Sequence, residues 1–102
     1  MDTKSKILDI AMNLNRVGNF AADDYTSKQK RIKIFLDQTS DYIKSLSYDD
    51  LPSSFKKTYS NFLNQYKNLE KEGLRGPKDE LKWAEDMMTW GNILTHRASL
   101  IK

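Results

Sequence analysis

The stretch "LPSSFKKTYSNFLNQYKNLEKEGLRGP", residues 51–77, decides the fold of this chain. Its large apolar residues recur at alternating spacings of four and three, which places them on one face of a helix. They are Phe55, Tyr59, Phe62, Tyr66 and Leu69. Pro52 prevents a preceding helix from continuing into the stretch. Gly73 is predicted to cap this helix, and Pro77 to lie in the first turn of the next one.

The segments on either side carry helical patterns of their own. We expect helices from about Thr3 to Ala21, from about Tyr25 to Leu46, and from Pro77 to about Ile101. Between the first two, the chain either continues as a helix or turns at Asp23 and Asp24. No run of residues alternates with the period of two that a half-buried strand requires. The sequence therefore predicts an all-α fold: a single-domain bundle of three or four helices, mostly antiparallel, formed by residues 1–102.

Small residues mark the places where two of these helices can approach closely. Gly18 lies on the apolar stripe of the first helix, and Ala84, Gly91 and Ala98 recur every seven residues along the last one. Without large side chains, a neighbouring backbone can lie near such a seam. We expect the seam of the last helix to pack either inside the protomer or at the axis of a dimer.

The composition limits the classes of protein to which this chain can belong. Its 102 residues are 38% hydrophobic and 30% charged, which is typical of a folded domain. Because cysteine is absent, disulfides, thiolate metal sites and thiol nucleophiles are excluded. The N-terminal segment lacks an uninterrupted apolar region, and no window approaches the roughly 20 apolar residues of a membrane span. We expect a cytoplasmic protein with no membrane partner.

A basic segment suggests one possible partner. Residues 25–46 hold a charge of +3, which equals the net charge of the whole chain, and four cations lie within six residues: Lys28, Lys30, Arg31 and Lys33. Cations that lie together on one face of a helix can bind the phosphates of a nucleic acid. On a helical wheel, however, these four point to different sides, and Asp37 and Asp41 follow on the outer face. Weak, sequence-nonspecific nucleic-acid binding is therefore an alternative function, and the favoured interpretation is a solvated face.

The residues that could carry catalysis are sparse. His96 falls on the polar arc of the last helix, so it should be exposed, as in the histidine phosphotransfer domains to which this chain is similar in size and class. The lysine and glycine that follow the histidine in that family are replaced here by Ser99 and Leu100. Adjacent carboxylates point about 100° apart on a helix and do not share a substrate easily. We expect no enzyme activity, no cofactor and no metal site, with phosphotransfer at His96 a distant third function.

Three strings resemble segments of a known group of proteins. "LNRVGNFAADDY", "FLDQTSDYIKSL" and "WAEDMMTWGNILTHRASL" are similar to segments of small helical proteins of cyanobacteria that have no assigned activity. Together these strings cover about half of the chain. The resemblance implies a cytosolic, non-secreted protein, and it transfers no catalytic residue.

The leading functional hypothesis is a non-catalytic protein-interaction or regulatory module. One border of the apolar stripe on the last helix carries the residue types of a binding hot spot. They are Trp83, Trp90, Ile93, Arg97 and Leu100. For each tryptophan taken singly, burial in the core is the favoured interpretation.

The first and last helices also carry more apolar residues than a small bundle needs. Leu8 and Met12 lie off the main stripe of the first helix, and Ile93 and Leu100 lie off that of the last helix. A monomer that exposes all four would present an unusually apolar surface. We therefore expect a homodimer whose two-fold interface uses the last helix and, as a further contribution, the first.

Overall fold

The computed structural model describes residues 2–101, and the regular structure in this range is helical throughout. In chain order the elements are α1 (Thr3–Ser45), the short 3-10 helix η1 (Tyr48–Asp50), α2 (Ser53–Arg75) and α3 (Glu80–Ala98). The predicted all-α bundle is confirmed. α3 ends three residues before the predicted Ile101, in a turn at Ser99 and Leu100.

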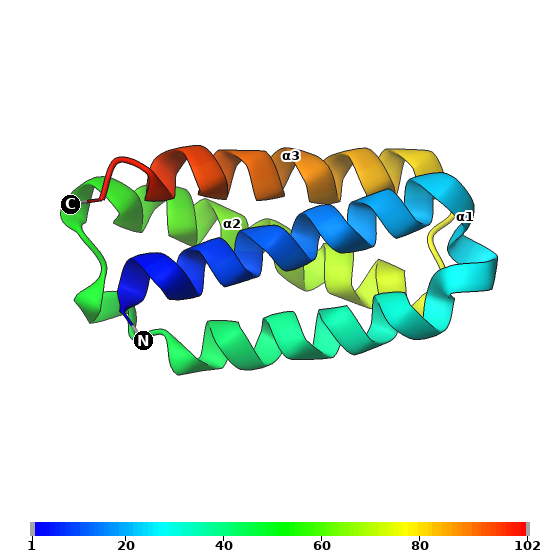
Figure 1. Ribbon diagram of the computed structural model, residues 1–102, viewed down its shortest axis with the longest axis horizontal. Coiled ribbons are helices and arrows are strands. Elements are labelled where there is room, and N and C mark those ends of the chain that lie inside the picture. Colours follow the sequence, from blue (N-terminus) through cyan, green and yellow to red (C-terminus); the bar gives the residue numbers. More distant parts are fainter. Residues whose placement is uncertain (1, 102) are drawn as a thin grey trace.

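A corner at Asp24 divides α1 into two antiparallel halves (Figure 1). The backbone of Asp24 is extended there, with φ −164° and ψ 94°, while residues 3–23 and 25–45 on either side are helical. The Asp24 carboxylate accepts a hydrogen bond from the Ser27 amide at 3.2 Å, as an N-cap residue does. The sequence left open a continuous helix or a corner, and the corner is the answer. The bundle therefore has four helical segments in space.

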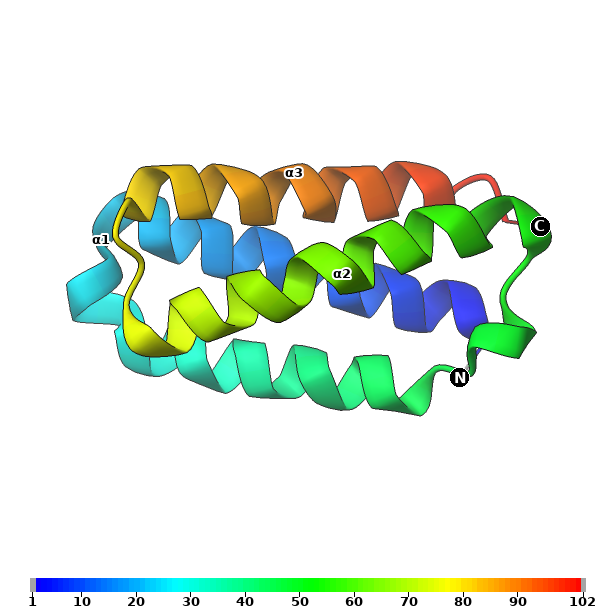
Figure 2. The same ribbon diagram turned by 180° about the vertical axis from the view of Figure 1, so that it is seen from behind.

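The two halves of α1, α2 and α3 run alternately up and down the bundle (Figures 1 and 2). The first half of α1 lies between α3 and the second half of α1. α2 lies on the opposite side, as the view from behind shows (Figure 2). A hydrogen bond of 3.0 Å from the side-chain amide Nδ2 of Asn13 to the side-chain oxygen Oε1 of Gln38 joins the two halves of α1. Each segment therefore has two neighbours.

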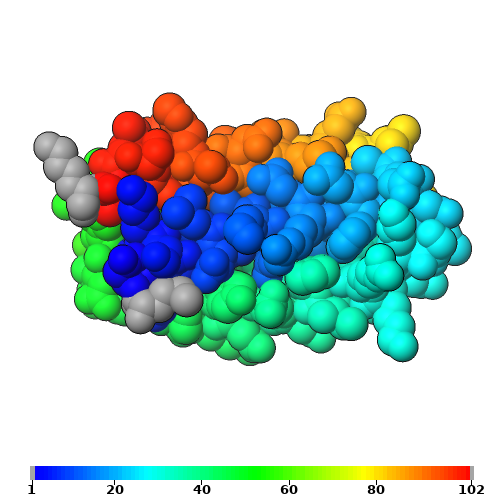
Figure 3. Space-filling model, viewed as in Figure 1, coloured from blue at the N-terminus to red at the C-terminus, as the bar shows by residue number. Residues whose placement is uncertain are grey.

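Small residues hold the first half of α1 close to α3. A Cβ atom on Gly18 would lie only 3.0 Å from the Ala84 carbonyl oxygen, and one on Gly91 would lie 2.8 Å from the Asn15 side chain. The predicted close approach at Gly18 is therefore present. Ala84, Gly91 and Ala98 are all buried, so this seam packs inside the protomer. Figure 3 shows the two segments in continuous contact along one face.

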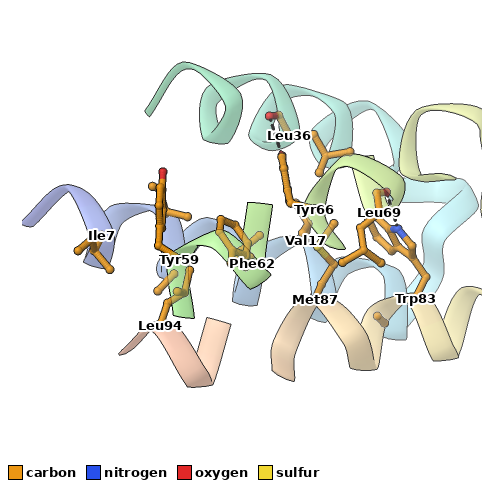
Figure 4. Packing of buried hydrophobic residues seen from close by; sticks show 14 of the residues in the cluster. Ile7, Val17, Leu36, Tyr59, Phe62, Tyr66, Leu69, Trp83, Met87 and Leu94 are labelled. Carbon is orange, nitrogen blue, oxygen red and sulfur yellow. Dashed lines mark hydrogen bonds between the residues drawn. The ribbon is translucent and has the colours of Figure 1, made fainter. Parts of the chain in front are cut away.

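The predicted apolar seam of α2 forms its side of the core. Phe55, Tyr59, Phe62, Tyr66 and Leu69 are all buried. The centroids of successive aromatic rings are 5.4–5.9 Å apart. These large rings fill the centre of the bundle, where they meet Ile7, Leu94 and Met87 from the other segments (Figure 4).

The loop between α2 and α3 corrects two predictions. Gly73 is buried inside α2 and does not cap it; Gly76, with φ 100°, ends the helix. Pro77 precedes α3, which begins at Glu80 with Asp79 as its N-cap. Pro77 has no amide to donate to the Gly73 carbonyl, and the Tyr25 hydroxyl donates to it instead at 2.5 Å. This contact, distant in sequence, satisfies a carbonyl group in the last turn of α2.

Two tyrosines of the α2 seam differ in what their hydroxyl groups contact. Tyr66 donates to the Leu36 carbonyl oxygen at 3.2 Å (Figure 4), whereas the buried Tyr59 hydroxyl has no hydrogen-bond partner among residues 2–101. An unpaired buried hydroxyl destabilises a fold, while a satisfied one stabilises it. Tyr59→Phe should therefore raise the free energy of unfolding by about 1 kcal/mol, and Tyr66→Phe should lower it by about 1 kcal/mol. Urea denaturation of both variants measures this; equal losses would contradict it.

The Tyr59→Phe variant should also differ from the unmodified protein at high pH. Burial raises the pKa of Tyr59 to about 12, whereas an unfolded tyrosine titrates near about 10. As the pH rises, the unfolded chain releases this proton first. The part of the folding stability that depends on Tyr59 keeping its proton is fully present below about pH 10, and it is lost between about pH 10 and 12. Over that window the stability of Tyr59→Phe should fall less steeply than that of the unmodified protein.

Candidate functional site

The structure brings three of the predicted contact residues together beside α2. Trp90, Ile93 and Arg97, spaced along one side of α3, line an open hollow of 480 Å³ between α2 and α3. Thr58 and Asn61 of α2 line it from the other side, and Asn92 and His96 complete it. The hollow thus combines an apolar wall with amide, hydroxyl and cationic groups.

Trp90 is the aromatic anchor of this hollow. It is half-buried, and its ring lies 5.6 Å from that of Phe62, measured between centroids. Phe62 is itself fully buried in the α2 seam, so it fixes the indole on the core side. The remaining indole surface borders the hollow. A rigid aromatic ring loses little conformational entropy on binding, which suits it to a contact with a partner.

Trp83 and Leu100 do not join this hollow. Trp83 is only 1% exposed; its indole nitrogen donates to the Leu69 carbonyl oxygen at 2.8 Å, and its ring meets Tyr25 edge-on. Trp83 therefore leaves the set of contact residues, because its indole belongs to the core. Leu100 is 63% exposed and lies just beyond the end of α3, outside the lining.

The hollow carries a positive charge, from Arg97, and no carboxylate of residues 2–101 lines its walls. Residues 53–69 of α2 and residues 87–101, from the middle of α3 onward, contain no aspartate or glutamate. Arg97 is exposed, and the ion pairs among the described residues are Lys28–Asp23 and Lys82–Asp86, so neither involves it. A guanidinium binds a carboxylate through two parallel hydrogen bonds. The hollow therefore suits an apolar group that is accompanied by a carboxylate from another molecule.

Helix periodicity found the α3 side of the hollow and missed the α2 side. Thr58 and Asn61 lie beside the buried seam of α2, where the sequence shows ordinary polar residues. The sequence placed His96 on the polar arc of the last helix and gave no sign that Asn92 would line the same hollow. Only the packing of α2 against α3 shows that these groups face the same space.

The basic start of the second half of α1 does not form one surface. Lys28 pairs with Asp23 at 2.5 Å, and its ammonium lies 5.6 Å from the centroid of the Phe20 ring. Lys30, Arg31 and Lys33 are exposed. One of the four cations is thus already engaged within the chain.

A second, smaller hollow of 230 Å³ lies between the second half of α1 and α2. Its charged residues have both signs: Lys44 and Lys67 lie near Glu70, whose carboxylate accepts a hydrogen bond from the Ser40 hydroxyl. Tyr66 and Leu63 supply its apolar lining. Because its charges are mixed, this hollow has less electrostatic preference for a partner than the one beside Trp90.

The part of the chain that the structure describes contains neither a cluster of metal ligands nor a helix that could span a membrane. No three side chains of histidine, aspartate or glutamate within residues 2–101 lie close enough together to hold a metal ion. None of the helices in that range has both the length and the apolar character required to cross a membrane. His96 is exposed on α3, as its place on the polar arc predicted.

Among known proteins, no family model, no curated protein and no solved structure matches this chain. The functional assignment therefore depends on the geometry and chemistry of the hollow between α2 and α3.

Proposed function

We propose that this chain is a non-catalytic protein-interaction module that docks a partner in the hollow between α2 and α3. The observation that carries the proposal is the meeting of Trp90, Ile93 and Arg97 on one open wall. Tryptophan and arginine are enriched among the residues that dominate binding energy in protein interfaces. The amides of Asn61 and Asn92 provide the polar rim that such interfaces have.

The chemistry of the lining supports binding more than catalysis. Among the side chains that line the hollow, His96 is the one of the type most often used as a general acid or base. A histidine base is usually oriented by a hydrogen bond to its second ring nitrogen, and the His96 ring makes no hydrogen bond to residues 2–101. Arg97, Trp90 and the amide side chains bind and orient a partner without exchanging protons.

A position-specific cross-link tests the docking function. A photoreactive phenylalanine analogue replaces Asn61, which is exposed and lines the hollow, and in a matched control it replaces exposed Gln29 on the second half of α1. In cells that naturally express the chain, irradiation should join the protein to one partner from position 61 and not from position 29. Adding Arg97→Glu should reduce that product at least about tenfold, because the attraction between Arg97 and a carboxylate of the partner is replaced by repulsion.

Three results would contradict docking at the hollow. They are the absence of a protein product at position 61, the same products from both positions, and a product at position 61 that Arg97→Glu leaves unchanged. A nuclease-sensitive product would assign the hollow to nucleic acid instead. Mass spectrometry of the joined peptides separates a different protein from a second copy of the chain.

A further inference from the structure

One side of α3 repeats the residue spacing of the α2 seam but is only partly covered by the rest of the chain. Asp86, Trp90, Ile93 and Arg97 follow one another at spacings of four, three and four, as Phe55, Tyr59, Phe62 and Tyr66 do on α2. Residues spaced in this way lie along one line of a helix. The α2 residues are buried, whereas those of α3 are half-buried or exposed. We call the four α3 residues the outer row.

The outer row is complementary to itself when two copies of α3 run antiparallel. Positions 86 and 97 are equally far from the point midway between residues 91 and 92, and so are positions 90 and 93. A two-fold axis at that point sets Arg97 against the partner's Asp86. It also sets Trp90 against the partner's Ile93. Attractive charge pairs then lie at both ends of the row, with apolar contacts in the middle.

We propose that the occupant of the hollow is a second copy of this chain, joined through antiparallel α3 helices along the outer row. The proposal rests on the docking function above and names its partner. An isologous interface requires a surface that matches itself under rotation by 180°, and the outer row meets that requirement in both charge and apolar character. The second copy also supplies the carboxylate that the acid-free surroundings of Arg97 lack.

Asp86 is able to make this additional contact. Within the chain it pairs with Lys82 at 3.0 Å, but 43% of the Asp86 side chain remains exposed. A carboxylate has two oxygens and accepts several hydrogen bonds, so it can hold Lys82 and a guanidinium together. The contact is limited in size, because the 19 residues of α3 are about 28 Å long at 1.5 Å per residue. We expect a dissociation constant of about 10–100 µM.

Two charge reversals, studied singly and together, test the pairing. Arg97→Glu sets a carboxylate at position 97 against the partner's Asp86 at each end of the row, and Asp86→Lys sets two cations against each other in the same way. Each variant alone should raise the dissociation constant at least about tenfold. In a heterodimer of the two variants, both repulsive pairs are replaced by attractive ones, the introduced glutamate with the introduced lysine at one end and Asp86 with Arg97 at the other, only if the chains pair as proposed. An equimolar mixture should form this one-to-one heterodimer more tightly than either variant alone forms a homodimer, as measured by sedimentation equilibrium with one chain labelled.

The folding of each variant is verified by circular dichroism, since both positions are on the surface and the helix content should not change. Three results would overturn the proposal. They are an unmodified chain that stays monomeric up to about 1 mM, variants that dimerise as tightly as the unmodified chain, and a mixture that does not associate. A monomeric chain that still cross-links a different protein from position 61 would remove the second copy as occupant and leave the docking function in place.

Discussion

Replacing Trp83 with alanine should lower the free energy of unfolding by about 3–5 kcal/mol. The indole is fully buried, it donates to the Leu69 carbonyl oxygen at 2.8 Å, and its ring lies edge-on to Tyr25 with the centroids 6.1 Å apart. Alanine leaves a large cavity and removes both contacts. Because a domain of this size is stable by only about 5–15 kcal/mol, a substantial part of its stability depends on this one side chain.

Trp90→Ala is the matched control, on the same helix and with the same change of side chain. Trp90 is half-buried and loses one aromatic contact, with Phe62, so we expect a smaller loss of about 1–2 kcal/mol. Guanidinium denaturation followed by circular dichroism measures both variants. Equal losses would show that Trp90 is as important to the core as Trp83, and Trp90 would then be a poor candidate for partner contact. Trp83→Phe keeps the protein folded if alanine does not.

A helical wheel of α3 could not predict which of the two tryptophans is buried in the core. Both were placed at one border of the apolar stripe of α3, and only the rest of the bundle distinguishes them. Near the start of α3, the end of α2 and the corner of α1 close over Trp83 with Gly73 and Tyr25. At Trp90 the same border faces the hollow. The difference depends on residues that are distant in sequence, so periodicity within one helix could not supply it.

The end of α2 could not be predicted for the same reason. The five residues before Pro77 contain two glycines, and local rules favoured the first, Gly73, as the cap. In the structure a Cβ atom at Gly73 would lie 2.5 Å from Trp83 Cζ2, so this glycine is needed for close packing. Gly76 supplies the positive φ that ends the helix. The two reasons for a glycine are indistinguishable until the neighbour of α2 is known.

Helical periodicity predicted the buried face correctly in α2, where the pattern within one helix is sufficient. The α2 seam is buried as predicted because its four aromatic residues and Leu69 occupy a narrow face with polar residues on either side. The outer row of α3 has the same spacing, yet it remains partly exposed. The expected excess of apolar surface also persists in part: Met12 is 50% exposed, while Leu8 and Ile93 are half-buried. Of these three residues, Ile93 belongs to the outer row along which we propose that a second copy docks.

Gly18→Leu should lower the free energy of unfolding by about 3 kcal/mol, the upper part of the range for overpacked cores. A Cβ atom added at this position would collide with Met88 Cγ and would lie 3.0 Å from the Ala84 carbonyl oxygen. The methionine can rotate away, but the carbonyl oxygen belongs to the backbone of α3. The rest of a leucine side chain can enter only if α3 moves away from α1.

Ala22→Leu, one helical turn further along α1, is the control because Ala22 is exposed and its change should stay within about 0.5 kcal/mol. Denaturant unfolding measures the loss, and the indole N–H resonance of Trp90 reports the displacement of α3. Gly18 faces the side of α3 that is turned away from the outer row. Because α3 carries both the outer row and one wall of the hollow, a displacement of α3 by Gly18→Leu should nevertheless weaken self-association. Loss of stability with an unshifted Trp90 resonance and unchanged association would show instead that α1 yields and α3 stays in place. The position of the proposed docking surface would then depend on α2 rather than on the close contact with α1.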